Sequence, residues 1–279
     1  MNLIFVAAIA VLVAGNIAAA ADTAEIRNAA SIPRFSAAQP GPPPAPWEVV
    51  KVNEKKKLTA YDLVEDSGKV VLHAVSQGSA SALGVPTRID VAKTPMIAWR
   101  WKVAGLIPGA DHAVASKEDA PARLMLTFDG DKGKLSLTDR TTIRIVSQLY
   151  GRDLPYATLM YVWSNDLPVG TVIANPHTKR IRMLVASSGK SGVGAWQSLE
   201  RNLRDDYRKA FGEEPGLLTS IAAFTDSDNT GSRAEAWYGD IALTAKQKRT
   251  TRPHGDAGTN GRACRACRPG AALRQHPAS

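Results

Sequence analysis

Oxygen-bearing side chains are concentrated in one short segment near the C-terminal end of the sequence. Asp226, Asp228 and Asn229 carry carboxylate or amide oxygens, and Gly231 follows where the chain must turn. Such oxygens are the ligands that calcium prefers. An EF-hand is excluded, because Trp237 stands at the position of its bidentate glutamate. The segment therefore predicts either one structural calcium ion, or no cofactor and a turn whose Asx side chains hydrogen-bond to their own backbone.

Three arginines alternate with apolar residues, which is the pattern of a strand with one polar face. They are Arg100, Arg123 and Arg182. Because successive side chains of a strand point to opposite faces, we expect all three on the polar face of a sheet. Tyr238 would add a stacking ring to that face and Asp240 a hydrogen-bond acceptor. Guanidinium groups repel one another unless carboxylates or an anionic ligand lie among them. The pattern therefore indicates either a binding site for an acidic ligand or a ladder of arginines and carboxylates.

Hydrolysis of a glycoside needs two carboxylates that face each other across a cleft. The sequence has no serine nucleophile elbow, and the string SSGKSG lacks the first glycine of a phosphate-binding loop, because Leu184 stands there. His177, in the string NPHTKR, is either a ligand contact or an ordinary loop histidine. The carboxylates that could serve a hydrolase are Asp119, Glu200, Asp205, Asp206, Glu235 and Asp240.

Short runs rich in Val, Ile, Tyr and Trp alternate with clusters of Gly, Asp, Asn and Pro through most of the chain. This alternation is typical of antiparallel strands. Helical periodicity is confined to residues 139–149 and 203–211. We therefore predict an all-β fold, an antiparallel β-sandwich of jelly-roll type with one or two short helices. The predicted strands are 58–64, 70–75, 96–103, 122–128, 158–163, 180–186, 196–202, 218–224 and 235–243.

Alternation also predicts which side chains form the core. In the string IAWRWKV, Trp99 and Trp101 share a face with Ile97 and Val103, so we expect core packing in place of a sugar-stacking platform. The opposite face, with Arg100 and Lys102, is then polar. The same argument directs further apolar residues inward, namely Leu124, Leu126, Phe128, Ile181, Met183 and Val185.

The N-terminus has the features of an export signal. An apolar run over residues 2–15 is followed by a run of alanines, which suits cleavage by a signal peptidase before Ala21 or Asp22. A membrane anchor is the alternative, but the run is short for a bilayer span and no Lys or Arg precedes it. No later segment is apolar enough to span a membrane. We expect a periplasmic or secreted protein without a transmembrane span after signal cleavage.

Charge and cysteine are both concentrated at the C-terminus. Of the formal net charge of +9 over 279 residues, the segment 246–279 contributes most, with eight Lys or Arg and one Asp. The rest of the chain is nearly neutral, which argues against binding of nucleic acid. Cys264 and Cys267 both lie in this tail, so no disulfide can stabilise the body. A lone CxxC without a second ligand pair is weak evidence for a zinc or redox site.

These features divide the chain into four parts. Residues 1–20 are the signal peptide and 21–46 a Pro-rich linker or arm, since QPGPPPAP can neither continue a helix nor pair as a central strand. Residues 47–245 form the β-sandwich domain. Residues 246–279 are a disordered basic tail, or the product of a shifted reading frame.

Five strings in the body carry a resemblance to a known family: PYATLMYVW, NPHTKRIRM, ERNLRDDYRKAFGEEPG, FTDSDNTG and AEAWYGDI. Together they resemble the bacterial family called domain of unknown function 3047, over about residues 35–243. The resemblance implies an exported protein without an established reaction, so it assigns no catalytic residue. The order of elements at the C-terminal end is also similar to that of galactose-binding-like jelly rolls of carbohydrate-binding modules, an analogy of fold that does not establish sugar binding.

The sequence favours an exported, non-catalytic β-sandwich module that binds a carbohydrate, or another acidic or polyol-rich ligand, on its polar sheet face. Two alternatives remain: a glycoside hydrolase or lyase acting on an envelope polysaccharide, and an envelope interaction protein without a small ligand. The ligand itself and the oligomeric state do not follow from the sequence.

Overall fold

The computed structural model describes residues 32–52, 55–150, 154–175 and 178–245. The expected signal peptide, residues 21–31 of the predicted linker or arm, His177 and the basic tail with Cys264 and Cys267 therefore lie outside the described residues. Within the described residues, no helix is both long and apolar enough to cross a membrane.

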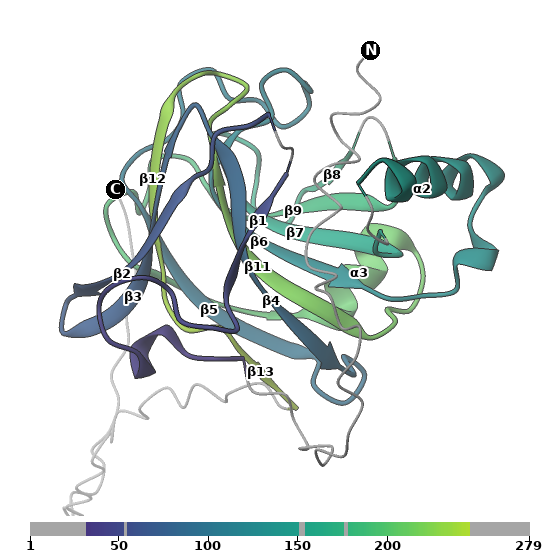
Figure 1. Cartoon of the computed structure of the whole chain (residues 1–279), viewed down its shortest axis with the longest axis horizontal. Coiled ribbons are helices and arrows are strands. Elements are labelled where there is room, and N and C mark those ends of the chain that lie inside the picture. The colour runs from purple at the N-terminus through teal and green to yellow at the C-terminus, as the bar shows by residue number, and fades with distance from the viewer. Residues whose placement is uncertain (1–31, 53–54, 151–153, 176–177, 246–279) are drawn as a thin grey trace, which may run out of the picture. The chain divides into compact units, whose positions relative to one another are not determined.

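The described strands form two sheets (Figure 1). One has seven strands in the order β1-β4-β11-β6-β7-β9-β8, and the other has the order β10-β5-β12-β3-β2, with β13 also paired to β5. Neighbours are antiparallel except β7 and β9, which are parallel. The strands are β1 (Glu48–Lys51), β2 (Ala60–Asp66), β3 (Lys69–Gln77), β4 (Ala80–Ile89), β5 (Met96–Val103), β6 (Ala120–Phe128), β7 (Ala157–Ser164), β8 (Val172–Ala174), β9 (Ile181–Ser188), β10 (Gln197–Asn202), β11 (Leu218–Asp226), β12 (Arg233–Tyr238) and β13 (Ala242–Thr244).

The described residues include two α-helices, α2 (Leu137–Tyr150) between β6 and β7 of the seven-stranded sheet and α3 (Leu203–Phe211) between β10 and β11 of different sheets. The Asn202 side chain caps the start of α3 by accepting from the backbone N–H of Asp205, and Gly212 ends it in the left-handed conformation. The predicted all-β sandwich with two short helices is thus confirmed.

The core between the sheets is aromatic. Trp99 and Trp101 of β5 are buried and meet two rings of β7, Tyr161 and Trp163. The Trp99 and Tyr161 rings stack with centroids 4.8 Å apart, and those of Trp101 and Trp163 lie 6.2 Å apart. The prediction that Trp99 and Trp101 belong to the core is confirmed. The two tryptophans connect the sheets across the sandwich.

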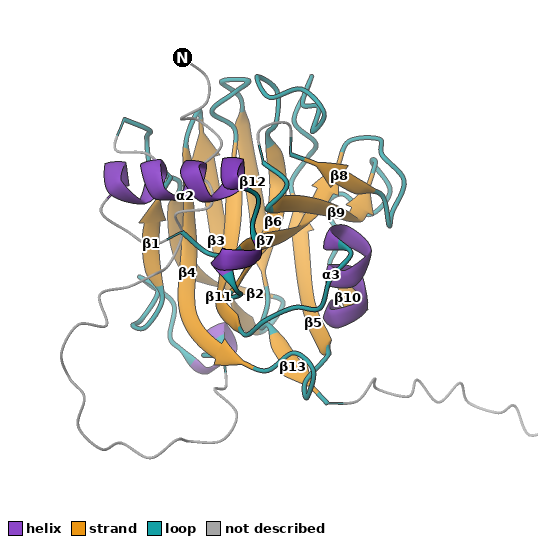
Figure 2. Cartoon of the chain, turned by 90° about the vertical axis from the view of Figure 1, so that its right-hand side faces the viewer, coloured by secondary structure: helices purple, strands orange, loops and turns teal. Residues whose placement is uncertain are grey.

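A second apolar cluster covers the other face of the seven-stranded sheet. Ile181, Met183 and Val185 belong to it, and Ile143 of α2 packs against it. Figure 2 shows α2 in front of this sheet. The prediction that these three β9 residues face the sandwich interior is wrong, because Leu184 and Ala186 do so. Both faces of β9 are buried, so apolar residues occupy both and alternation does not identify the inner one.

Sequence patterns missed β1, β4 and β8, and they merged β12 with β13. Strand β4 contains Gly84 and Pro86, which suggest a turn. In the fold, Pro86 pairs with Ser220 beside a register shift in β11, an irregularity that tolerates the missing N–H of proline. The predicted strand 235–243 is interrupted after Tyr238, where residues 239–241 leave the ladder.

The described part of the predicted linker or arm is an arm that packs on the domain. A short 3-10 helix, η2 (Phe35–Ala37), buries Phe35, whose ring lies 4.6 Å from that of buried Trp47. Gly41 pairs with Leu63 of β2. The Ser36 backbone N–H donates to Asp240 Oδ1 at 3.0 Å. The folded unit therefore begins before residue 47, where the sequence analysis placed its start.

Replacement of Phe35 tests whether the arm contributes to stability. Phe35→Ala is expected to lower the free energy of unfolding by about 3 kcal/mol, because it removes a fully buried ring. Ser36→Ala is the control, with an expected loss of about 1 kcal/mol for the hydrogen bond that the Ser36 hydroxyl donates to Asp240 Oδ2. Urea denaturation followed by fluorescence measures both. A loss below about 0.5 kcal/mol for Phe35→Ala, the usual effect of a surface substitution, would mean that the arm does not pack in solution.

Candidate functional site

The outer face of the six-stranded sheet is polar and only partly buried. Alternate residues of β5 point to it, and Ala98, Arg100 and Lys102 are half-buried there while their neighbours are buried. This confirms the expected polar face opposite the tryptophan core. Of the described helices, α3 lies where β9, β10 and β5 meet, α2 lies on the other sheet, and the short η2 contacts β3.

Strand register aligns one row of side chains across this face. Asp62 of β2 is opposite His73 of β3, and His73 is opposite Trp237 of β12. Trp237 is in turn opposite Lys102 of β5. Because Gln197 of β10 pairs with Trp101, the preceding residue, Trp196, continues the row next to Lys102. We call these five residues the outer row: Asp62, His73, Trp237, Lys102 and Trp196.

The indole of Trp237 stands on edge in this row. His73 stacks on it at a centroid distance of 4.9 Å and an interplanar angle of 16°. The Lys102 Nζ atom lies 4.3 Å from its centroid. These two partners come from the strands on either side of β12, so they cover both faces of the ring. Trp237 therefore presents its edge, and not a face, to solvent.

The indole of Trp196 is raised above the sheet. The Arg100 guanidinium lies 4.3 Å from its centroid and Lys102 Nζ lies 5.4 Å from it. Both cations come from β5, so they support the ring from the side of the sheet. Its Nε1–H donates to Asp66 Oδ1 at 3.3 Å. Trp196 is half-buried, so part of its ring remains exposed.

Gly239 lets Arg100 lie close to the sheet beneath Trp196. A Cβ atom at this position would overlap the Cγ and Nε atoms of Arg100, so the arginine lies directly on the glycine backbone. The backbone N–H of Gly239 donates to the Arg100 carbonyl at 2.9 Å. Gly239, Arg100 and Trp196 thus form three successive layers, with the indole outermost.

One of the two cations beneath Trp196, Lys102, is neutralised within the protein. Lys102 forms an ion pair with Asp66. The hydrogen bond from Lys102 lowers the pKa of the Asp66 carboxyl to about 2. At the other end of the face, Glu235 Oε1 contacts His73 Nε2 at 2.8 Å and its Oε2 accepts from Arg233 at 2.8 Å.

The three arginines predicted to share a face are in three different environments, so that prediction is wrong. Only Arg100 lies on the outer face of the six-stranded sheet. Arg123 lies in β6 of the seven-stranded sheet and is fully buried. Arg182 lies in β9, where its Nη1 donates to the carbonyls of Thr178 and Ile181. Alternation places a residue relative to its own strand, but it does not tell which sheet the strand joins.

Tyr238 and Asp240 do not belong to the outer face either. Tyr238 pairs with Trp101 and is buried in the core, where its hydroxyl contacts Thr225 Oγ1 at 2.8 Å. Asp240 follows the end of β12 and binds the arm through Ser36. The predicted strand 235–243 is interrupted at residues 239–241, so Tyr238 and Ile241 both face the core. Trp237 occupies the face that was assigned to Tyr238.

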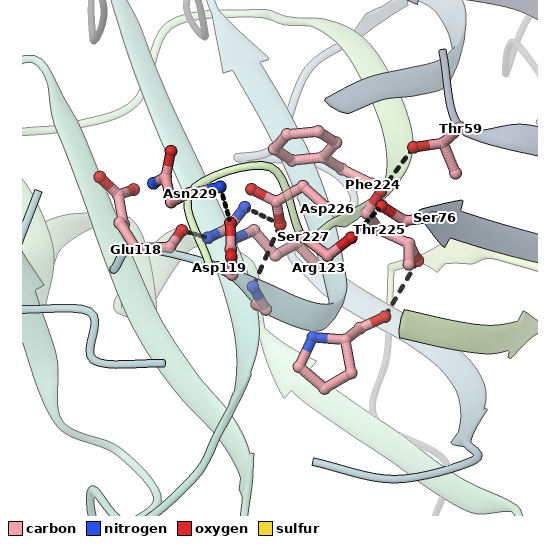
Figure 3. Close-up of polar contacts among 12 residues, drawn as sticks. Thr59, Ser76, Glu118, Asp119, Arg123, Phe224, Thr225, Asp226, Ser227 and Asn229 are labelled. Atoms are coloured by element: carbon pink, nitrogen blue, oxygen red, sulfur yellow. Dashed lines mark hydrogen bonds and ion pairs between the residues drawn. The ribbon is translucent and has the colours of Figure 1, made fainter. Parts of the chain in front are cut away.

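An acidic cluster lies at the end of β11, at the turn singled out in the sequence (Figure 3). Asp226 accepts from the Arg123 guanidinium at 2.5 Å and from the Ala120 backbone N–H at 3.1 Å. Burial raises the pKa of the Asp226 carboxyl to about 7, and Arg123 opposes that shift. Arg123 also donates to the carbonyl of Glu118.

Asp119 completes this cluster from a distant part of the chain. It accepts from the backbone N–H groups of Asn229 at 3.1 Å and Thr230 at 2.7 Å. The turn is therefore capped by a carboxylate from another segment and not only by its own side chains. Sequence spacing could not reveal this pairing, because more than 100 residues separate the partners.

The cluster could hold a divalent cation. One carboxylate oxygen from each of Asp119, Asp226 and Asp228 lies within 4.8 Å of the others, a separation that calcium–oxygen bonds can bridge. The predicted ligand Asn229 is placed differently, because its Nδ2 donates to the Ala115 carbonyl at 3.2 Å. Asp228 forms an ion pair with Lys56. The calcium interpretation and the hydrogen-bonded turn both remain compatible with this arrangement.

The carboxylates considered for hydrolysis are dispersed over the described residues. Asp206 is bound by Arg201 at 2.6 Å and by the Tyr161 hydroxyl at 2.8 Å. Asp240 holds the arm and Asp119 belongs to the acidic cluster. Of the six, Glu235 and the exposed Glu200 belong to the outer face.

Comparison with known proteins identifies one family. The model of the family described as "Protein of unknown function (DUF3047)" matches residues 45–242, in agreement with the resemblance stated above. No curated protein matches the chain at a significant level.

Solved structures show only distant similarity. The family 11 carbohydrate-binding module of the cellulosomal cellulase Lic26A-Cel5E of Clostridium thermocellum matches with a TM-score of 0.34 and 10% identity, over 71% of this chain and 86% of that one. The family 30 module of Cel9D-Cel44B from the same organism matches with a TM-score of 0.33 and 13% identity, over 74% and 89%. The xyloglucanase domain of NopAA from Sinorhizobium fredii has a TM-score of 0.32 and 8% identity, over 72% and 99%. Similarities at this level add nothing to the site geometry.

A double-mutant cycle tests the layering on Gly239. Gly239→Ala is expected to lower the free energy of unfolding by about 1–3 kcal/mol, because the new methyl group displaces Arg100. In an Arg100→Ala background the same substitution should cost much less. Gly105→Ala is the matched control, since a Cβ there meets no atom within 4 Å. An equal cost in both backgrounds would contradict the contact.

Thermal unfolding with calcium or chelator tests the acidic cluster. On the calcium interpretation, added calcium raises the melting temperature and chelator lowers it. Joint Asp226→Asn and Asp228→Asn should abolish the response, and Asp62→Asn on the other sheet should keep it. The response should strengthen as pH rises through about 7, because Asp226 must lose its proton to bind a cation. Equal melting temperatures in calcium and in chelator would leave only the hydrogen-bonded turn.

Proposed function

The chain belongs to the family described as protein of unknown function (DUF3047), and we propose that it is an exported, non-catalytic β-sandwich module that binds a carbohydrate on the outer face of its six-stranded sheet. The export part of this proposal rests on the apolar run and small residues at the N-terminus. The binding part rests on the geometry of the outer row.

The observation that carries the proposal is the raised indole of Trp196. A pyranose has a face of C–H groups that packs on an aromatic ring, while its hydroxyl groups need hydrogen-bond partners. Trp196 is half-buried, so part of its ring is exposed, and the ring is held by Arg100 and by Asp66 at its Nε1 atom. Holding the ring in place before the ligand arrives reduces the entropy lost on binding.

Polar groups for the sugar hydroxyls surround this ring. Lys102 has N–H groups beyond the one that pairs with Asp66, and the edge of Trp237 lies next to it. Glu200 and Ser198 are exposed on β10, on the same face. An aromatic surface with a few placed polar groups is the usual composition of a small-molecule site.

A neutral sugar suits this face better than the acidic ligand expected from the sequence. That expectation required gathered arginines, but only Arg100 is present, and it lies beneath Trp196. Lys102 and Arg233 are paired with Asp66 and Glu235. Two of the cations are paired and the Arg100 guanidinium is covered by the Trp196 ring, so the face has little accessible positive charge to attract an anion.

The same pairing favours binding without catalysis. A general acid for glycoside hydrolysis needs a raised pKa, whereas Lys102 holds the pKa of Asp66 near 2. Glu235 is held by Arg233 and His73. Neither carboxylate is prepared to give a proton to a leaving group.

Replacement of Trp196 tests the proposal. Trp196→Ala is expected to weaken binding to a neutral polysaccharide at least about tenfold, because a stacked aromatic anchor contributes more than 1.4 kcal/mol. Affinity electrophoresis in gels containing soluble neutral glucans, xylans or mannans measures it. Leu137→Ala, which removes an apolar side chain 75% exposed on α2, is the control.

Two results would contradict the proposal. The first is wild-type protein that migrates unretarded in every polysaccharide gel, and the second is retardation unchanged by Trp196→Ala. Release of reducing ends from a bound glycan would show instead that the protein is a hydrolase.

A further inference from the structure

The outer row has two different ends. Trp196 forms an apolar platform at one end, over β10. At the other end, Asp62, His73 and Glu235 form a polar group on β2, β3 and β12. Asp62 is exposed and has no hydrogen-bond or ion-pair partner among the described residues. A ligand that contacted both ends would find stacking at one and hydrogen-bond acceptors at the other.

The separation of the ends follows from the order of the strands. Four steps between neighbouring strands lead from β10 through β5, β12 and β3 to β2. At about 4.8 Å a step, Asp62 lies about 19 Å from Trp196 along the sheet, whereas Asp66, at the end of the same strand β2, binds Trp196 and Lys102. A single sugar is far shorter than this row, so one monosaccharide can occupy only one end.

The middle of the row is suited to a chain that passes over it. The two faces of Trp237 are covered by His73 and Lys102, so its edge forms a low ridge that offers no second stacking platform. Lys102 Nζ lies between the Trp237 and Trp196 rings and keeps N–H groups for a passing hydroxyl. The middle therefore offers hydrogen bonds along the path.

We propose that the ligand is a linear, equatorially linked neutral glycan that lies across the strands, from Trp196 to Asp62, and fills at least three sugar positions. This inference rests on the proposed function and adds the length, direction and linkage of its ligand. Equatorial linkages, as in β-1,4-linked glucose, give an extended ribbon that follows a straight row. Axial linkages curve the chain away from it. Each β-1,4-linked ring advances the chain by roughly one strand spacing.

A series of oligosaccharides of increasing length tests this inference. β-1,4-linked glucose oligomers from one to six units are titrated into the full-length protein by calorimetry. Affinity should rise with each unit to about four, the number of strand spacings in the row, and then level off. α-1,4-linked glucose oligomers of the same lengths are the comparison and should bind at least about tenfold more weakly.

Two substitutions separate the ends of the row. Trp196→Ala should weaken binding of every length, because it removes the platform. Asp62→Ala should weaken binding of the four-unit and longer oligomers about tenfold and leave the two-unit oligomer unchanged. Asp62 is an exposed strand residue, so its loss should not disturb folding. Glu48→Ala, an exposed carboxylate on β1 of the other sheet, is the matched control.

The outcomes distinguish this inference from the function on which it rests. Equal affinity for all lengths, equal affinity for both linkages, or no effect of Asp62→Ala on the longer oligomers would overturn the extended ligand, while sugar binding at Trp196 would stand. Wild-type protein that binds no oligosaccharide of either series, and is unretarded by the polysaccharides, would overturn both.

Discussion

Strand β5 is the constraint on which both the core and the candidate site depend. Its inward residues, Trp99 and Trp101, pack against β7 of the opposite sheet. Its outward residues, Arg100 and Lys102, both support Trp196, and Lys102 also covers one face of Trp237. Because side chains alternate along a strand, the packing that fixes the tryptophans inside also fixes the two cations outside. If β5 shifted by one residue relative to its neighbours, Arg100 and Lys102 would be buried and Trp99 and Trp101 would be exposed.

The two sheets differ in what covers their outer faces. The seven-stranded sheet is apolar on both sides, and its outer cluster packs against Ile143 of α2. The six-stranded sheet is apolar only inside, and its outer face has aromatic rings and paired charges. This difference directs the search for a ligand to the six-stranded sheet. The acidic cluster around Arg123 is buried on the other sheet, where its hydrogen bonds join the loop before β6 to the turn after β11.

Local patterns predicted much of the fold but little of the site. Strand β5 and helix α3 have the predicted bounds, because alternation in IAWRWKV and the Asn202 and Gly212 caps act within a few residues. The site depends on register between strands far apart in sequence, which alternation within one strand does not contain. Arg123 and Arg182 were therefore grouped wrongly with Arg100. Trp196 was assigned only to a strand end, although a tryptophan just after the glycine-rich string SGKSGVGA, beside the polar strand with Arg100, was a signal that could have identified it.

The central claim is that a neutral glycan stacks on Trp196. The most direct measurement is a nuclear magnetic resonance titration of the indole N–H signals with a β-1,4-linked glucose oligomer, since each of the six tryptophans gives one such signal. The account predicts that the signal of Trp196 moves most and that of Trp237 moves less. Those of buried Trp101 and Trp163 should stay in place. A ligand that shifts other signals and leaves Trp196 unmoved would contradict it.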